Sequence, residues 1–580
     1  MEHYPTWPNL PAMMFGLART WPDKPLLRRF RDGGWHSTTW GEFGRMAASC
    51  ARHLRAAGVT AGDRVVIVSE NRPEYPIAET ALMALRAVPV PTYTSNTVAD
   101  HAHILRDSGA RAAIVSSPAL AGALREAGRL AGGLDLLVVI DGPPDASPRA
   151  LDLGDAGGSP RLMHWGALAA DDAPADDIAL EAASIPADAL ACLIYTSGTG
   201  GAPKGVMLPH RSILSNCRGA FELLRPLRLQ DEVYLSYLPA SHSYEHTVGL
   251  YFLPSIGTEI AYCRGVEHLA ADLLTIRPTI LTAVPRVLEV IRSRVLTQVA
   301  RQARWQQALF NRALELGMKR ADGRRMNVLE GVIDPLLDRL VRAKVQARFG
   351  GRLKAAMSGG ARLEPEVGRF FLALGLMIMQ GYGQTEAGPV ISANPPDGIR
   401  IDTVGRVLQG VDVRLAEDDE ILVRGDLVMQ GYWGLPDATA AVIRDGWLHT
   451  GDIGALDDDG YLRITDRKKD MIVLSGGENV SPAKVEGMLM TEPEISQAVV
   501  AGDGRSSLTA LVVPTQGYDD VAAALAITRV NHRLSVTERI RKHAVVEAFT
   551  VENGLLTPTQ KIRRVLVIRA NTNVLAKLHG

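Results

Sequence analysis

The chain has few cysteines and no long hydrophobic run. Its four cysteines, Cys50, Cys192, Cys217 and Cys263, are widely spaced and form no Cys-x-x-Cys pair. We therefore expect reduced core thiols of a cytosolic protein, which excludes a disulfide framework and a cysteine metal site. The longest apolar stretch, residues 370–379, is about half the length that a bilayer requires. Any membrane contact is therefore expected to be peripheral.

A global excess of charge and a secretory signal are also absent. The net charge of −1 and the pI of about 6.9 give no reason to expect nucleic-acid binding. Residues 1–5 carry neither the basic nor the apolar segment of a signal peptide. These features predict a cytoplasmic protein. Its 580 residues exceed one ordinary core and predict at least two domains.

Apolar strand candidates alternate with helical patterns in the first part of the chain. The strand candidates lie at 64–69, 88–93, 112–116 and 134–140. A helical pattern over residues 74–87 separates the first two, which is typical of a βαβ unit and predicts a largely parallel sheet covered by helices. Residues 141–188 are rich in Asp, Ala, Pro and Gly, and we expect a long surface connection there.

The alternation resumes from residue 190 and then gives way to other patterns. Its strand candidates lie at 232–238, 258–263, 279–283, 353–357 and 376–380. After residue 410 short strands of antiparallel type follow, and from Asp466 an α+β pattern begins with a charged linker. We therefore predict an α/β protein. Its large N-terminal domain, residues 1–465, would hold stacked α/β sheets and a small β-subdomain, and residues 466–580 would form a small mobile α+β domain.

The most informative segment is Tyr195-Thr-Ser-Gly-Thr-Gly-Gly-Ala-Pro-Lys204-Gly205, which directly follows an apolar run. A strand that ends in such a loop leaves backbone N–H groups and hydroxyls free to surround phosphate oxygens, and Lys204 adds a mobile positive charge. Pro203 and Gly205 beside this lysine exclude the P-loop of common NTPases. Pro203 also occupies the third glycine position of a dinucleotide fingerprint. The segment therefore predicts a polyphosphate site.

Two further glycine-rich turns, at residues 358–361 and 380–386, follow later strand candidates. Ligands of open α/β sheets bind at the carboxyl ends of the strands, where glycines leave the backbone uncovered. A flat ring could lie between these turns and stack on Tyr382. Thr385 could then donate to a phosphate, and Glu386 could hold a magnesium ion that bridges phosphate oxygens.

The remaining motif of this kind is His449-Thr-Gly-Asp452, whose carboxylate is suited to accept hydrogen bonds from the hydroxyl groups of a ribose.

Taken together, these motifs resemble those of the acyl-adenylate-forming superfamily, the AMP-dependent synthetases and ligases, in the same order from about residue 10 to about residue 570. Gly200 replaces the second threonine of the usual loop.

The resemblance implies a set of residues that bind ATP or AMP. They are Thr196, Ser197, Gly198, Thr199, Gly201, Lys204, Gly359, Gly360, Ala361, Gln380, Gly381, Tyr382, Gly383, Thr385, Glu386 and Asp452. The metal is expected to be Mg²⁺, held by Glu386 and Thr196.

The resemblance continues into the last part of the chain. By position, Arg467 corresponds to the arginine that contacts the ribose, Lys469 to the hinge between the domains, and Gly476 to the backbone of a tunnel for the thiol of coenzyme A. Lys561, in the sequence Leu556-Thr-Pro-Thr-Gln-Lys561, corresponds to the catalytic lysine. The form of this motif and Asp466 resemble the long-chain acyl subgroup.

The segment from Leu238 to His246 resembles the acyl-pocket motif, with His242 beside the substrate carboxylate. A buried histidine with satisfied hydrogen bonds is the alternative interpretation. The apolar residues 248–256 would then form a wall of the acyl pocket. With Lys561, Lys204 and Thr199, His242 completes the catalytic residues that the resemblance implies.

The resemblance is greatest to long-chain fatty acid to CoA ligases, and implies an activity in two steps. A fatty carboxylate would react with ATP to give acyl-AMP and pyrophosphate, and coenzyme A would then take the acyl group. The alternatives are an acyl-AMP ligase that serves the phosphopantetheine of a carrier protein, activation of a different carboxylic acid, and a non-catalytic ligand sensor. The intact segment 467–482 argues against the carrier protein, and the presence of Lys561 and Glu386 argues against a sensor.

Residues 292–354 form an unusually basic segment, with 15 Lys and Arg against 5 Asp and Glu, a net charge of +10. Helical spacing is visible in Trp305, Leu309, Ala313 and Leu316, and again in Ile333, Leu336 and Leu340. We expect an amphipathic helical pair, packed on the main domain with a solvated basic face. The alternative is a peripheral contact with an anionic membrane. A homodimer is also compatible with the resemblance.

Overall fold

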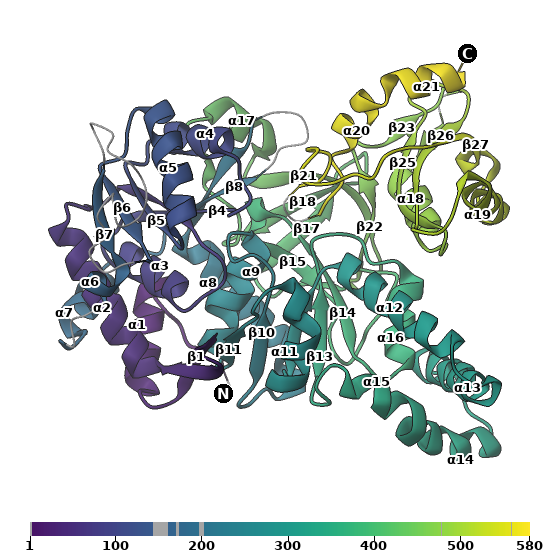
Figure 1. Ribbon diagram of the computed structural model, residues 1–580, viewed down its shortest axis with the longest axis horizontal. Helices are drawn as coiled ribbons and strands as arrows, with labels where there is room; N and C mark the ends of the chain where they lie inside the picture. The colour runs from purple at the N-terminus through teal and green to yellow at the C-terminus, as the bar shows by residue number, and fades with distance from the viewer. Residues whose placement is uncertain are drawn as a thin grey trace.

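The computed structural model describes residues 3–142, 160–169, 173–196, 202–476, 478–557 and 560–579. Figure 1 shows a large N-terminal part with several sheets and a smaller C-terminal part that adjoins it. The sheets are mixed α/β and antiparallel, as predicted, and the smaller part has its own sheet and helices.

The central sheet has nine strands in the order β16-β15-β14-β13-β12-β10-β11-β1-β2. Its strands are β1 (Pro25–Arg31), β2 (Gly34–Thr39), β10 (Val233–Ser236), β11 (Glu259–Tyr262), β12 (Ile280–Ala283), β13 (Ala355–Ser358), β14 (Ile378–Gly383), β15 (Val390–Ala393) and β16 (Arg406–Val407). Strands β10 to β14 and the β1–β11 pair are parallel, whereas β2, β15 and β16 join antiparallel. The five strands expected between residues 232 and 380 are therefore confirmed.

A second sheet, entirely parallel, has the order β4-β3-β5-β6-β7. Its strands are β3 (Arg64–Val68), β4 (Val88–Thr92), β5 (Ala112–Val115), β6 (Leu136–Val139) and β7 (Arg161–His164). Strand β5 is buried along its whole length, because strands with helices on both faces consist of apolar residues. The helices of this region are α1 (Leu10–Thr20), α2 (Trp40–Ala56), α3 (Glu74–Ala84), α4 (Val98–Ser108) and α5 (Pro118–Ala131).

The prediction of a surface connection over residues 141–188 is wrong in its second half. Strand β7 lies there and adds a parallel edge to the second sheet, and α6 (Trp165–Leu168) and α7 (Asp176–Ala183) follow it. Ile178 and Ala182 of α7 are buried in the main core. The short polar strand and the small residues of α7 gave little hydrophobic periodicity, so the pattern of the sequence did not reveal them.

The glycine-rich loop belongs to an antiparallel hairpin. Strands β8 (Leu190–Thr196) and β9 (Lys204–Pro209) pair so that Thr196 faces Lys204, and β19 (Gly431–Tyr432) completes a three-stranded sheet. Helix α8 (His210–Leu224) follows this hairpin directly. The loop therefore connects two adjacent strands, and the βα alternation resumes only after it.

An antiparallel subdomain follows residue 410, as predicted. Its sheet consists of β17 (Val411–Leu415), β18 (Glu420–Gly425), β20 (Ile443–Arg444), β21 (Trp447–Leu456) and β22 (Leu462–Arg467), with α17 (Pro436–Val442) before β20. The C-terminal part contains β23 (Ile472–Val473), β24 (Asn479–Val480), α18 (Pro482–Met490), β25 (Ile495–Ala501), β26 (Leu508–Pro514), α19 (Asp520–Arg533), β27 (Ile540–Val545), α20 (Arg564–Ala570) and α21 (Thr572–His579). Two hydrophobic clusters of its own lie there. We propose that the domain boundary lies in the turn of residues 468–470.

Residues 285–347 form a helical segment between β12 and β13. Its helices are α12 (Pro285–Ala300), α13 (Arg304–Ala321), α14 (Val328–Leu337), a π-helical turn (Asp338–Arg342) and α15 (Ala343–Ala347). The expected helices are confirmed. Among the described residues, no helix is both long enough and apolar enough to cross a membrane.

Candidate active site

The two glycine-rich turns that follow β13 and β14 lie side by side. In the parallel register, Ala283 of β12 faces Ser358, and Ser358 faces Gln380 of β14. Three neighbouring strands therefore end at one edge of the sheet, where ligands of such sheets bind. The backbone N–H of Gly359 donates to the carbonyl of Ala283 at 3.0 Å, so the first turn continues the register of its strand.

Other groups approach two of these glycines closely, and at Gly383 they exclude any side chain. A Cβ atom on Gly383 would lie 1.8 Å from the carbonyl oxygen of Pro389, so no side chain fits there. A Cβ on Gly359 would lie 3.2 Å from the ring of Tyr244, which closes one side of the first turn. Gly360 has a φ of +79°, which favours glycine. Gly360 and Ala361 are exposed, and Gly381 is half-buried beside Ser392.

Asp452 connects the second turn to the antiparallel subdomain. The hydroxyl of Tyr382 donates to Asp452 Oδ2 at 2.6 Å, and Arg467 Nε lies 3.2 Å from Asp452 Oδ1. Asp452 faces Arg467 in the register of β21 and β22, so the sheet itself holds the pair together. Burial raises the pKa of Asp452, against the opposing effect of the Arg467 charge. The ring of Tyr382 is thereby fixed at the strand end, where it could stack on a base.

A second group of polar side chains surrounds Tyr432. Its hydroxyl donates to Glu386 Oε1 at 2.9 Å, and Lys204 Nζ lies 4.8 Å from the centroid of its ring. Lys204 thus lies over the ring of Tyr432, and Glu386 lies at its hydroxyl. Thr385 Oγ1 lies 2.9 Å from Ser243 Oγ. Tyr432 and Ser243 were not predicted to belong to the site. The sequence signal for Tyr432 is weak, because it consists only of an aromatic pair directly after Gly431.

The expected magnesium ligands fit this cation only in part. Glu386 supplies one carboxylate near Lys204, and Thr196 lies partly exposed at the start of the loop. Within the described part of the chain, no cluster of three or more His, Cys, Asp or Glu could hold a metal by itself. One carboxylate is sufficient for Mg²⁺ that takes its other ligands from phosphates and water. Of the other loop residues, Ser197, Gly198, Thr199 and Gly201 lie outside the described residues.

His242 is held in one tautomer by the helix that follows it. Its Nδ1 accepts a hydrogen bond from the backbone N–H of Tyr244 at 3.2 Å, as the N-cap of α9 (Ser243–Thr247). An Nδ1 that accepts leaves the proton of the neutral ring on Nε2. Burial, together with the charge of Lys561, lowers the pKa of His242 to about 3. The imidazole is therefore a neutral donor at neutral pH.

Glu245 and His246, which follow His242 in the same motif, form contacts within the protein core. Glu245 is buried and accepts hydrogen bonds from Tyr234, Ser236 and Thr282, and its burial raises its pKa to about 7. His246 Nε2 lies 3.0 Å from Glu79 Oε1 in the core. These contacts anchor α9 to the central sheet. His242, the N-cap residue of α9, is therefore held in a fixed position.

Lys561 lies among the same residues although it belongs to the C-terminal part. Burial by the surrounding protein and the charge of Arg467 lower the pKa of Lys561 to about 8, and Asp452 opposes this effect. Its backbone N–H donates to Thr557 Oγ1 at 3.0 Å, and its carbonyl accepts from the Thr557 N–H at 2.8 Å. The residue keeps an exposed surface, as expected for a side chain that reaches into an open site. The structure therefore brings Lys561 together with His242, Arg467 and Asp452.

Three residues that were predicted to belong to the site, Gln380, Lys469 and Gly476, lie apart from the groups described above. Gln380 is buried, accepts from the Leu363 N–H at 2.9 Å and donates to the Thr403 carbonyl at 3.1 Å, so its side chain is used within the protein. Lys469 is exposed in the turn after β22, and Gly476 is exposed between β23 and β24.

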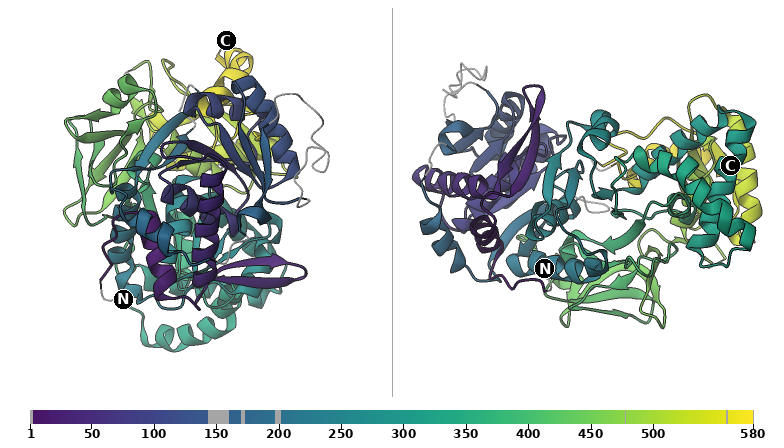
Figure 2. Two further views of the ribbon diagram at one scale, coloured as in Figure 1. Left: turned by 90° about the vertical axis from the view of Figure 1, so that its left-hand side faces the viewer. Right: turned by 90° about the horizontal axis from the view of Figure 1, so that it is seen from below.

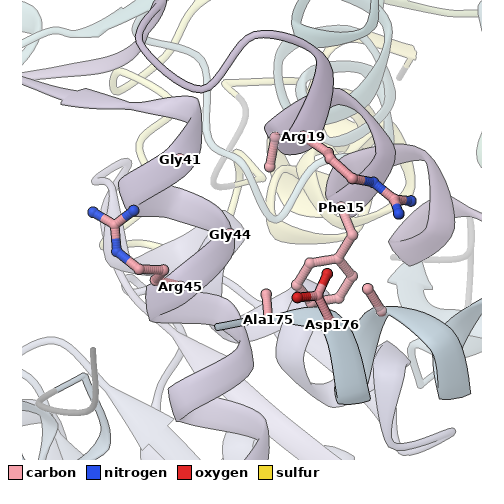
Figure 3. Close-up of a pocket in the computed structure, with 9 residues that line it drawn as sticks. Phe15, Arg19, Gly41, Gly44, Arg45, Ala175 and Asp176 are labelled. Carbon is pink, nitrogen blue, oxygen red and sulfur yellow. The ribbon is translucent and has the colours of Figure 1, made fainter. Parts of the chain in front are cut away.

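A cavity of about 140 Å³ lies elsewhere, between α1, α2 and α7 (Figure 3). Phe15, Arg19, Arg45 and Asp176 are among the residues that line it. No predicted site residue belongs to its described lining, so we do not assign it to the site.

Comparisons with known proteins place the chain in a family. The model of the family described as AMP-binding enzyme matches residues 16–433, and that of the AMP-binding enzyme C-terminal domain matches residues 469–574. The chain is 33% identical over 587 residues to the protein named long-chain-fatty-acid--CoA ligase FadD15 of Mycobacterium tuberculosis, covering 96% of this chain and 95% of the relative. It is 30% identical to long-chain-fatty-acid--CoA ligase 5 of Mus musculus, covering 86% and 78%.

Solved structures show the same fold. A benzoate CoA ligase from Burkholderia xenovorans LB400 matches with a TM-score of 0.72 and 24% identity, covering 96% of this chain and 99% of that one. The anthranilate CoA ligase AuaEII, solved in complex with anthranoyl-AMP, matches with a TM-score of 0.74 and covers 99% of both chains at 20% identity. The predicted resemblance to adenylate-forming enzymes is confirmed, and the chain belongs to the AMP-binding enzyme family.

Proposed function

We propose that this protein is a fatty acid to CoA ligase that prefers medium or long acyl chains. It would activate the acid with ATP to acyl-AMP and then transfer the acyl group to coenzyme A, releasing AMP and pyrophosphate. The observation that carries the proposal is the arrangement at the strand ends, where Tyr382 and Arg467 both contact Asp452 beside the second glycine-rich turn and the charge of Lys561 acts on His242. The names of the relatives support the choice of a fatty acid.

In the first step, an oxygen of the fatty carboxylate attacks the α-phosphorus of ATP, and the bond from that phosphorus to the bridging oxygen breaks. Negative charge on the phosphate oxygens has to be stabilised as pyrophosphate leaves. Lys561 and Lys204 supply positive charge, and His242 can donate its Nε2 proton to a carboxylate oxygen. Thr199 would contribute a hydroxyl by resemblance.

The nucleotide would be held by contacts that are already assembled. The adenine would stack on Tyr382, and the ribose hydroxyls would bind Asp452 and Arg467, which form one ion pair in the structure. Glu386 and Thr196 would hold Mg²⁺, which neutralises charge on the phosphates when it is bound. The hydrogen bond from Tyr432 to Glu386 fixes the position of that carboxylate.

In the second step, the thiol of coenzyme A attacks the acyl carbonyl, and the bond between the acyl carbon and the phosphate oxygen breaks, releasing AMP and a thiol proton. Lys561 has no role in this step. We propose that the C-terminal domain turns at Lys469, withdraws Lys561 and brings the backbone at Gly476 towards the site.

The test is an assay of products for a series of carboxylic acids, with and without coenzyme A. We expect AMP and pyrophosphate, an acyl-AMP that accumulates without coenzyme A, and a thioester when it is present. A matched pair of variants, Lys561→Ala and the exposed Lys577→Ala, separates the site from general effects of lost charge. Release of ADP, or transfer only to a carrier protein, would contradict the proposal.

A further inference from the structure

Helix α14 presents an apolar face to solvent. Val328, Leu329, Val332, Leu336 and Leu340 are 41 to 88% exposed. They recur at spacings of one, three and four residues and so form one stripe along α14 and the π-helical turn after it. We call these five residues the α14 face. Of the three residues whose spacing predicted a packed amphipathic helix, Ile333 packs, whereas Leu336 and Leu340 are exposed.

The opposite side of the helix is the one that packs. Leu337 is fully buried with Ala313 and Leu316 of α13, and Ile333 packs against this cluster. The N-cap residue Asn327 fixes the start of α14, because its side chain accepts from the Glu330 N–H at 2.8 Å. The α14 face is thus an apolar side of the helix that takes no part in its packing on α13.

The acidic side chains of α14 and of the π-helical turn are paired with basic residues of α13 or with Arg342 of that turn. The ion pairs join Glu330 to Arg312 and Lys319, Asp334 to Arg320 and Arg342, and Asp338 to Arg320 and Arg342. Their negative charge is therefore neutralised by these pairs. Arg325, Arg339 and Lys344 are exposed close to these residues in the sequence, and Arg324 is exposed with its Nε 3.8 Å from Asp322 Oδ2.

We propose that the α14 face docks the protein on an anionic lipid surface. Apolar side chains flanked by exposed Arg and Lys are the pattern of helices that lie in a membrane interface. An anionic headgroup layer attracts such basic residues, whereas a neutral layer does not. The acids would oppose this attraction if they were unpaired, but they form ion pairs within the segment.

The position of the helix suits this role. Helix α14 lies at an edge of the molecule, where the segment reaches away from the sheets (Figure 1, Figure 2). Helix α12 of the same segment begins at Pro285, directly after the end of β12 at the site. Docking through α14 would therefore attach the protein to a lipid surface through a segment whose first helix begins at the site. The proposal does not depend on which acid the enzyme activates.

The test is flotation of the full-length protein with vesicles of phosphatidylcholine alone or mixed with phosphatidylglycerol. We expect binding only to the mixed vesicles, weakening as salt concentration rises. The double variant Leu329→Gln, Val332→Gln should bind at least tenfold more weakly. The double variant Arg325→Gln, Arg339→Gln should bind about 25-fold more weakly, since each basic residue near such a surface contributes about fivefold.

Matched controls change the same residue types elsewhere. Val521→Gln, Leu525→Gln alters two exposed apolar residues of α19, and Arg541→Gln, Arg569→Gln removes two exposed arginines. Both controls should bind as the unchanged protein does, and thermal unfolding should show that all four variants fold. Equal binding to neutral vesicles, or unchanged binding of the Leu329 and Val332 variant, would overturn the proposal. A dimer seen by light scattering and abolished by that variant would assign the α14 face to a second copy instead.

Discussion

The amine of Lys561 is expected to lose its positive charge near pH 8. Burial and the charge of Arg467 lower its pKa to about 8 in the free protein. Because only the protonated amine stabilises negative charge on the phosphate, activity should fall as the pH rises through that value. The protonated share drops from about nine tenths at pH 7 to about one tenth at pH 9. The kcat/KM of adenylation reports the free enzyme and should therefore fall about tenfold over this range.

The assay is single-turnover formation of acyl-AMP without coenzyme A, because the coenzyme A thiol titrates in a similar range. Lys561→Arg keeps a positive charge at all these pH values, so its kcat/KM should not show the fall above pH 8. Lys561→Ala should be slower by about 10²-fold, the scale of losing one preorganised charge donor, and its rate should not show the same fall.

The control is the second half-reaction, started from synthetic acyl-AMP and coenzyme A at one pH. Lys561→Ala should perform it at close to the normal rate, because in our proposal Lys561 is withdrawn from the site during this step. If Lys561→Ala lost both half-reactions equally, the assignment of Lys561 to the first step would be wrong. A fall above pH 8 that persisted in Lys561→Arg would assign the titration to another group.

Three further predictions concern the hinge, the turns and the acyl pocket. Lys469→Pro should slow thioester formation but not adenylation in stopped-flow assays, because a fixed φ at the pivot hinders rotation; equal loss of both steps would contradict this. Gly383→Ala should lower the free energy of unfolding by about 2–3 kcal/mol, because its Cβ would meet the Pro389 carbonyl at 1.8 Å. The helical control Gly331→Ala, with nothing within 4 Å, should raise it by about 0.5–1 kcal/mol in denaturant titrations. Finally, kcat/KM should rise from acetate to palmitate by up to about fourfold per buried methylene, and a flat profile would refute the preference for long chains.

Local patterns predicted the parallel sheets well because buried strands carry their own signal. The candidate at 112–116 is β5 (Ala112–Val115), and the candidate at 279–283 is β12 (Ile280–Ala283). Strand β7 (Arg161–His164) carried no such signal, since it is a polar edge strand within a segment of small residues. The helices of the basic segment were predicted, but periodicity alone could not tell which apolar residues of α14 find a partner.

Side chains that meet across the fold were beyond any local pattern. Tyr432 holds Glu386 only because β19 pairs with β9, far away along the chain. The family resemblance predicted His242 and Lys561 as two separate site residues. That the charge of Lys561 acts on His242 depends on how the C-terminal part lies against the strand ends. Gln380 is a case in which the motif predicted too much. The motif predicted contact with a ligand, whereas the side chain forms hydrogen bonds with two backbone groups of the protein.

The arrangement of charges gives a physical reason for a mobile C-terminal domain. The positive charge of Arg467 disfavours that of Lys561, and Asp452 opposes this repulsion to a smaller extent. A bound polyphosphate would relieve this repulsion, so ATP should favour the arrangement in which Lys561 is inserted. Once pyrophosphate has left, most of that negative charge is gone and the repulsion returns. Departure of the first product would therefore weaken the hold on Lys561 at the moment when coenzyme A requires access.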